Sequence, residues 1–141
     1  MTRTPGKPID PDAHGIIDYA FAAFLFLVPR MLGLNPIARL VSYALGSTIG
    51  AVNALSAPKG VYPVLPFRTH GKLEEPLIPA LILLPWLTGQ LHRRGTRAYF
   101  VMIFGMAAVN FFLTDYDHDR RPARHRFQRP APAREMIGAD I

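Results

Sequence analysis

A pentapeptide of the pattern His-Gly-x-x-acid occurs twice in this chain, as His14-Gly15-Ile16-Ile17-Asp18 and as His70-Gly71-Lys72-Leu73-Glu74. Imidazole and carboxylate groups can bind metal ions, transfer protons or form buried hydrogen bonds. The histidine and the acid are four residues apart in each copy. On a helix, both therefore lie on one face, separated by about 6 Å along the axis.

The spacing of these elements indicates an internal duplication. Each copy opens an apolar run that ends on a matched proline and glycine, and every matched position is offset by 56 residues: Pro29 and Gly33, Pro85 and Gly89. Late in the following apolar run, Asn53 and Asn110 are offset by 57 residues. We therefore expect two matched trios, which are His14, Asp18 and Asn53 in one half and His70, Glu74 and Asn110 in the other.

The elements that carry these residues are predicted to be membrane helices. Half of the 141 residues are hydrophobic and 18% are charged, and the charges lie between the apolar runs. Each run reaches about 20 residues with its flanks, which is enough to cross a hydrocarbon core of about 30 Å. The sequence thus predicts an all-α fold, a four-transmembrane-helix antiparallel bundle built from two pseudo-symmetric helical hairpins.

The boundaries follow from the turn residues and the charges. Residues 1–12 form a polar N-terminal segment, 13–116 the membrane domain with repeats at about 13–57 and 69–116, and 117–141 a basic, disordered tail. The helices are expected at about 13–32, 36–57, 72–91 and 96–116. Pro79 removes a backbone donor within the third helix, so we expect a kink there.

Four spans place both termini and the middle loop on one side of the membrane. That side carries eleven lysine and arginine residues, and the other side carries five. Because the cytoplasmic side is usually the more positive one, we expect a multi-pass protein of the bacterial inner (plasma) membrane with both termini cytoplasmic. The apolar run nearest the N-terminus has no small-residue cleavage site, so no cleavable signal peptide is expected.

The partners expected from the sequence are the lipid bilayer and, through helix two, another helix. The basic tail is typical of a topology signal, so we expect no nucleic-acid partner. Small residues recur every four positions in helix two and allow close backbone approach: Ser42, Gly46, Gly50 and Ala54. This stripe indicates either packing within the monomer or a homodimer or membrane-complex face.

Four interpretations of the polar cluster are compatible with the sequence. His14, Asp18, His70 and Glu74 lie in one depth band, because helices one and three begin on the same side. They can form a structural polar belt together with Asn53 and Asn110, which needs no cofactor. They can also bind a divalent metal, with a ligand set that suits zinc, iron or manganese. A third interpretation is a haem held between His14 and His70, and a fourth is a path for protons or small solutes.

Two further segments resemble a known family. Leu84-Pro85-Trp86-Leu87-Thr88-Gly89, with a histidine and an acid one span earlier, resembles the Ser-Pro-Trp-x-x-Gly element of the SPW-repeat family of small bacterial membrane proteins. Val28-Pro29-Arg30-Met31-Leu32-Gly33 is similar to the same element without its tryptophan. The resemblance covers about residues 13–116 and implies a two-hairpin, four-span membrane domain. It implies no activity, because the family carries none that is firmly assigned.

The sequence favours a non-enzymatic protein over an enzyme. It contains no cysteine, which excludes thiol nucleophiles and thiolate metal sites. Neither a Gly-x-Ser-x-Gly element, a phosphate-binding glycine loop nor a His-Glu-x-x-His motif is present. We therefore expect a non-enzymatic accessory or interaction protein of the membrane. The alternatives are a metal- or haem-binding redox component and a translocator of protons or small solutes.

Overall fold

The computed structural model describes residues 7–116, which form helices joined by short connections. The elements are α1 (Pro11–Met31), α2 (Pro36–Ala54), α3 (Phe67–Glu74), α4 (Leu77–Leu87), the 3-10 turn η1 (Gln90–His92) and α5 (Arg94–Leu113). The all-α prediction is confirmed for this part of the chain. The predicted disordered tail, 117–141, lies outside the described residues.

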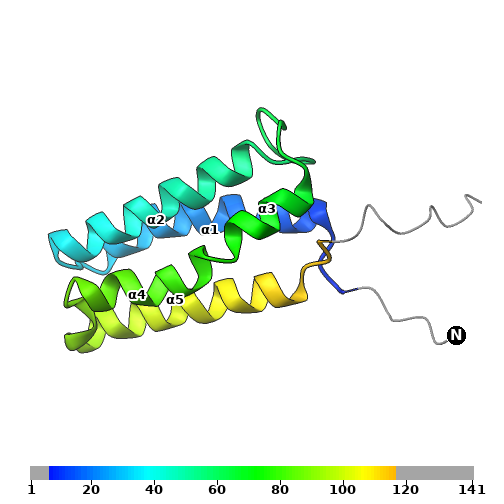
Figure 1. The fold of residues 1–141 in the computed structure, drawn as a ribbon. Helices are drawn as coiled ribbons and strands as arrows, with labels where there is room; N and C mark the ends of the chain where they lie inside the picture. The colour runs from blue at the N-terminus through cyan, green and yellow to red at the C-terminus, as the bar shows by residue number, and fades with distance from the viewer. Residues whose placement is uncertain (1–6, 117–141) are drawn as a thin grey trace, which may run out of the picture.

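The helices form two antiparallel hairpins that lie side by side (Figure 1). One hairpin consists of α1 and α2, and the other of α3 and α4 followed by α5. The first and last described residues meet at one end, where the Ile9 amide donates to the Leu113 carbonyl at 3.2 Å and the Asp115 amide to the Ile9 carbonyl at 2.9 Å. Helix α3 lies at this same end (Figure 1).

Local sequence explains where α1 and α2 begin and end. Asp10 caps α1 by accepting from the Ala13 amide, and Asn35 caps α2 by accepting from the Ala38 amide. Each cap is followed by a proline at the first helical position, where no amide hydrogen bond is lost. Gly33 follows α1 with a φ of 62°, a left-handed conformation that glycine adopts without steric cost.

The third predicted helix is broken, and its predicted boundaries are wrong. Its first part is α3, which begins at Phe67, and its second part is α4, which ends at Leu87. The break lies at Glu75 and Pro76 and not at Pro79, where we expected a kink. Pro76 would have to donate to the Lys72 carbonyl in a continuous helix and cannot, whereas Pro79 lies in the first turn of α4, where its missing donor costs nothing.

Small residues on α2 pack against α1 within the chain. The Ser42 hydroxyl donates to the Leu25 carbonyl at 2.8 Å. A methyl group added at Gly46 would lie 3.0 Å from Leu25 Cβ, and one added at Gly50 would lie 3.6 Å from Ala22 Cβ. The stripe thus serves the within-monomer packing that was one of the two expectations; a homodimer through it stays a prediction.

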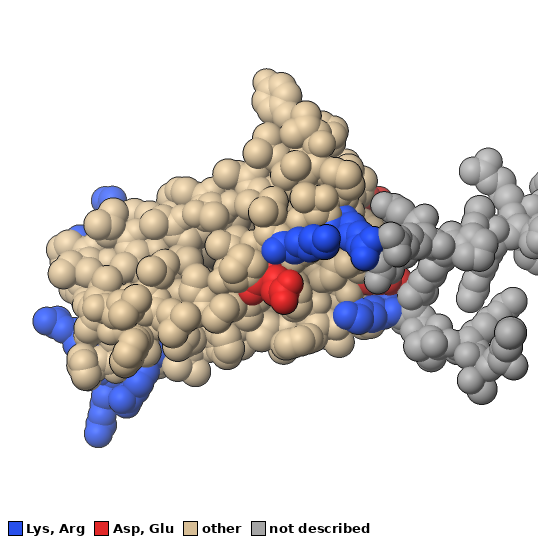
Figure 2. Space-filling model, in the orientation of Figure 1, with Lys and Arg blue, Asp and Glu red and all other residues tan. Residues whose placement is uncertain are grey.

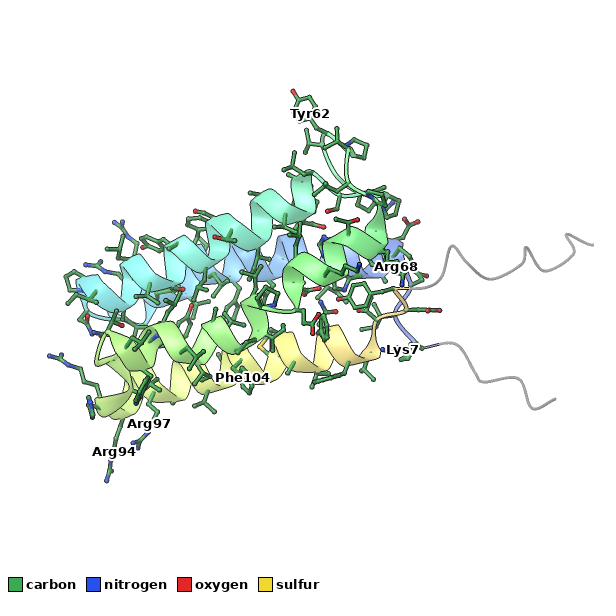
Figure 3. All side chains as sticks on the ribbon, in the orientation of Figure 1. Lys7, Tyr62, Arg68, Arg94, Arg97 and Phe104 are labelled. Atoms are coloured by element: carbon green, nitrogen blue, oxygen red, sulfur yellow. The ribbon has the colours of Figure 1, made fainter. Side chains whose placement is uncertain are left out.

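Much of the surface is apolar. Leu27 on α1, Leu40 on α2, Trp86 on α4 and Phe112 on α5 are 61% to 67% exposed. On the face drawn in Figure 2, uncharged side chains cover most of the surface. A small acidic group lies near the middle, and lysine and arginine lie beside it and toward the two ends. Arg94 and Arg97 project at one end, and Lys7 and Arg68 lie at the other (Figure 3).

Two of the described helices, α1 and α5, are long and apolar enough to cross a membrane. With 11 residues, α4 extends for about 17 Å and is too short to span a bilayer by itself. The fold therefore contains two helices that could span a membrane, which is fewer than the four that the sequence predicted.

Candidate metal-binding site

Four ionisable side chains meet at the end of the bundle where α1 begins. His14 and Asp18 come from the first turns of α1, and His70 and Glu74 come from α3. All four are buried, with exposures of 0%, 2%, 1% and 6% in chain order. One donor atom from each residue lies within 4.8 Å of the donors of the other three. We call these four residues the His/acid cluster.

The distances that involve the two histidine Nε2 atoms are short and similar. The two Nε2 atoms are 3.0 Å apart. His14 Nε2 lies 3.2 Å from both Asp18 Oδ2 and Glu74 Oε2. His70 Nε2 lies 3.1 Å from Asp18 Oδ2 and 3.6 Å from Glu74 Oε2. Four donors thus surround one small volume.

Two hydroxyl groups fix the orientation of the imidazoles. Ser56 Oγ donates to the Val52 carbonyl at 2.6 Å and lies 3.0 Å from His70 Nδ1. Thr114 Oγ1 donates to the Asn110 carbonyl at 2.7 Å and lies 2.7 Å from His14 Nδ1. A hydroxyl has one proton and the carbonyl takes it, so each hydroxyl accepts from the Nδ1–H of its histidine. In this assignment Asn110 Nδ2, which lies 3.3 Å from His14 Nδ1, donates to Asp18 Oδ1 instead. In the neutral imidazole the proton is then on Nδ1, and Nε2 offers a lone pair to the cluster.

The cluster therefore needs positive charge at its centre. Lone pairs of two Nε2 atoms and two carboxylates face one another, and this arrangement is repulsive without a proton or a cation between them. The carboxylates of Asp18 and Glu74 lie 3.1 Å and 3.6 Å from His70 Nε2, so they favour positive charge on or beside this imidazole. The carboxylates thus attract positive charge toward the imidazoles, and a metal dication supplies it in one ion.

Aromatic rings enclose the cluster on one side. The Phe67 ring stacks on His70 with centroids 5.6 Å apart, and the Tyr116 ring lies edge-on to His14 at 5.4 Å. The Tyr116 hydroxyl donates to Glu74 Oε2. Burial and the neighbouring Glu74 carboxylate both raise the pKa of Tyr116, so its hydroxyl keeps the proton that it donates.

The glycine in each pentapeptide permits close packing beside its histidine. A methyl group added at Gly71 would lie 2.6 Å from the Tyr116 ring, and one added at Gly15 would lie 2.9 Å from Lys59 Cβ. Both distances are shorter than packed carbon atoms allow. In each His-Gly pair the histidine supplies a side-chain nitrogen to the cluster. The glycine, which has no side chain, leaves room for the residue packed beside it.

The two predicted asparagines lie in different environments. Asn110 Nδ2 donates to Asp18 Oδ1 at 3.2 Å, which places Asn110 next to the cluster. Asn53 Nδ2 instead donates to the Gly15 carbonyl at 2.8 Å and holds α2 against α1. The structure thus brings Asn110 together with the cluster but does not bring Asn53 into it.

Sequence reasoning missed the residues that support the cluster, which are Ser56, Phe67, Thr114 and Tyr116. A signal for the hydroxyls exists, because Ser56 and Thr114 follow Asn53 and Asn110 by three and four residues. Each hydroxyl, however, contacts the histidine of the other half of the chain: Ser56 contacts His70 and Thr114 contacts His14. Comparing matched positions of the two repeats does not predict contacts between the halves.

The donor arrangement fits a first-row transition metal. Bonds of about 2.0–2.2 Å place tetrahedral ligand atoms roughly 3.3–3.6 Å apart and neighbouring octahedral ones roughly 3.0 Å apart. The five distances that include a histidine Nε2, from 3.0 Å to 3.6 Å, fall within this range. A haem between the histidines does not fit, because two axial Nε2 atoms would be about 4 Å apart on opposite sides of the iron.

A scan of protein-family models and searches of curated proteins and of solved structures find no match to this chain. The similarity to the SPW-repeat family therefore stays a prediction, based on the two proline-glycine segments. Any function has to be argued from the chain's own geometry.

Proposed function

We propose that this chain is a multi-pass membrane protein that binds one first-row transition-metal ion through His14, Asp18, His70 and Glu74. The observation that carries the proposal is the convergence of the two histidine Nε2 lone pairs with two buried carboxylates. The four donor atoms lie within 4.8 Å of one another, which is close enough for one ion to contact all four. This geometry favours metal binding over the accessory role that the sequence favoured.

The charge balance supports the same proposal. Two carboxylates and a divalent cation are together neutral when both histidines are neutral. A neutral site is favoured here, because an unpaired charge inside a membrane has a high free-energy cost. The hydroxyls of Ser56 and Thr114 hold the histidines as hydrogen-bonded partners hold metal-binding histidines in other proteins.

The apolar surface supports the membrane location. Contiguous exposed apolar patches of more than a few hundred square ångströms are rare on soluble monomers, whereas this chain exposes large apolar side chains on α1, α2, α4 and α5. In our proposal α2 and the broken α3–α4 pair complete four spans in the inner membrane. The cluster then lies near the cytoplasmic face, with both termini.

The test is metal analysis of the chain purified in detergent, followed by titration with Zn²⁺ and with Co²⁺, whose visible spectrum reports its ligands. We expect one ion per chain. Glu74→Gln should lower the affinity at least tenfold, whereas its exposed neighbour Glu75→Gln should not. His70→Asn should behave like Glu74→Gln, and the exposed His92→Asn like the parent chain.

The two interpretations of the cluster give different results in this experiment. A fully folded, metal-free chain that takes up neither ion would overturn metal binding and leave the structural belt. In that case Glu74→Gln would lower thermal stability and have no effect on metal content. Helix content measured by circular dichroism on every variant shows which changes come from unfolding.

A further inference from the structure

A cavity of about 250 Å³ opens beside the His/acid cluster. Its walls are mainly apolar and come from α1, α4 and α5 with Ile49 of α2; Phe21, Phe24, Leu77 and Met106 are among them. Polar side chains occur at one end only, where Asp18, Glu74 and Asn110 line it. The cavity thus has an apolar body and a polar end, and the polar end adjoins the proposed metal.

One buried acceptor at this end has no partner. Among the described residues, Asp18 Oδ2 and Asn110 Oδ1 are the buried side-chain atoms that lack a hydrogen-bond partner. A metal ion accounts for Asp18 Oδ2, which faces both Nε2 atoms. It does not account for Asn110 Oδ1, because Asn110 turns its Nδ2 group toward Asp18 Oδ1. Asn110 is 8% exposed and lines the cavity, so a molecule bound in the cavity can supply the donor that Oδ1 lacks.

We propose that the cavity binds a small apolar molecule with a neutral hydroxyl group, which donates to Asn110 Oδ1 beside the metal. The inference rests on the proposed function in that it assigns a ligand class to the same site. A hydroxyl is both a donor and an acceptor, so its oxygen can face the metal while its proton is donated. An ionised fatty acid does not fit, because its carboxylate has no proton to donate to Asn110 Oδ1.

The size and the opening of the cavity indicate the rest of the ligand. A cavity of roughly 150 Å³ holds benzene, so a volume of about 250 Å³ suits a molecule of two fused rings or of similar bulk. Ile17, Ala20 and Met106 line the cavity and are exposed at the surface of α1 and α5. In the membrane these residues face lipid, so the ligand enters from the bilayer.

The test compares three probes of nearly equal shape on the metal-loaded protein in lipid nanodiscs, with empty nanodiscs as the background. The probes are 2-naphthol, which has a hydroxyl donor, and naphthalene and 2-methoxynaphthalene, which lack one. We expect saturable binding of one 2-naphthol per chain, at least tenfold tighter than the other two. Asn110→Leu should reduce this preference to about one while naphthalene still binds. Retained naphthalene binding separates a lost hydrogen bond from a collapsed cavity.

A second variant closes the cavity from its rim. Ala20→Trp should abolish binding of every probe and keep the metal, whereas Ala23→Trp, exposed on the same helix away from the cavity, should change neither. Equal affinity for the three probes, or a preference that Asn110→Leu retains, would overturn the hydroxyl ligand and leave metal binding intact. Conversely, a metal-free chain with an Asn110-dependent preference for 2-naphthol would overturn the proposed function and keep this inference.

Discussion

At the scale of residues, each histidine of the cluster depends on a hydroxyl from the other half of the chain. Residue types and spacing predicted that the two histidines and two acids lie at the same end of the helices, and the structure brings the four together there. The pairing of Ser56 with His70 and of Thr114 with His14 was not predictable, because it depends on how the two hairpins pack together. For the same reason Asn53 and Asn110, which match in the sequence, bond to different partners.

Removal of either hydroxyl should weaken metal binding while all four ligands remain. In Thr114→Val the Nδ1–H of His14 loses its acceptor, so the imidazole is no longer held in its tautomer and orientation. We expect a roughly 10–100-fold loss of metal affinity, measured by competition with a chromophoric chelator. Ser56→Ala should act in the same way through His70. Thr48→Val is the control, since Thr48 Oγ1 makes the same type of bond, to the Ala44 carbonyl, on an exposed surface; an equal loss in this variant would contradict the argument.

At the scale of elements, apolar runs and turn residues predicted α1, α2 and α5 to within three residues at each boundary. The broken third helix was not predicted, because Pro76 and Pro79 lie close together and sequence alone does not say which one begins a new helix. Glu74, which belongs to the His/acid cluster, is the last residue of α3. The break allows α3 to direct the Glu74 side chain into the cluster while α4 packs along the other helices of the bundle.

The contact of α3 with the end of the chain should be sensitive to a single methyl group. Gly71→Ala places Cβ within 2.6 Å of the Tyr116 ring, and overpacking of this kind typically costs about 1–3 kcal/mol. We expect a lower midpoint of thermal unfolding in detergent. Gly105→Ala meets no atom within 4 Å in α5, and it should leave stability unchanged or raise it by up to about 1 kcal/mol, as alanine does within helices. Equal midpoints for the two variants would show that Gly71 has no packing role.

At the scale of the whole molecule, the proposed metal joins the two hairpins, since two of its ligands come from α1 and two from α3. A ligand that binds only the folded state stabilises it, by about 2.7 kcal/mol at a hundredfold excess over Kd. Removal of the metal by a chelator should therefore lower the unfolding midpoint of the parent chain and of Glu75→Gln. The unfolding midpoint of Glu74→Gln should be lower than that of the parent chain before the chelator is added, and the chelator should change it little. Unchanged midpoints after verified metal removal would mean that the ion does not hold the hairpins together.

The number of spans can be measured because the chain has no cysteine, so single cysteines report where they lie. Tyr62 is 72% exposed in the loop after α2, and Arg94 is exposed at the opposite end of the bundle (Figure 3). With four spans, Tyr62→Cys should react with a membrane-impermeant maleimide only from the cytoplasmic side and Arg94→Cys only from the other side. If α1 and α5 alone cross the membrane, both cysteines lie on the same side and react together. Labelling of right-side-out and inverted vesicles distinguishes these outcomes, and reaction of both cysteines from one side would overturn the four-span arrangement.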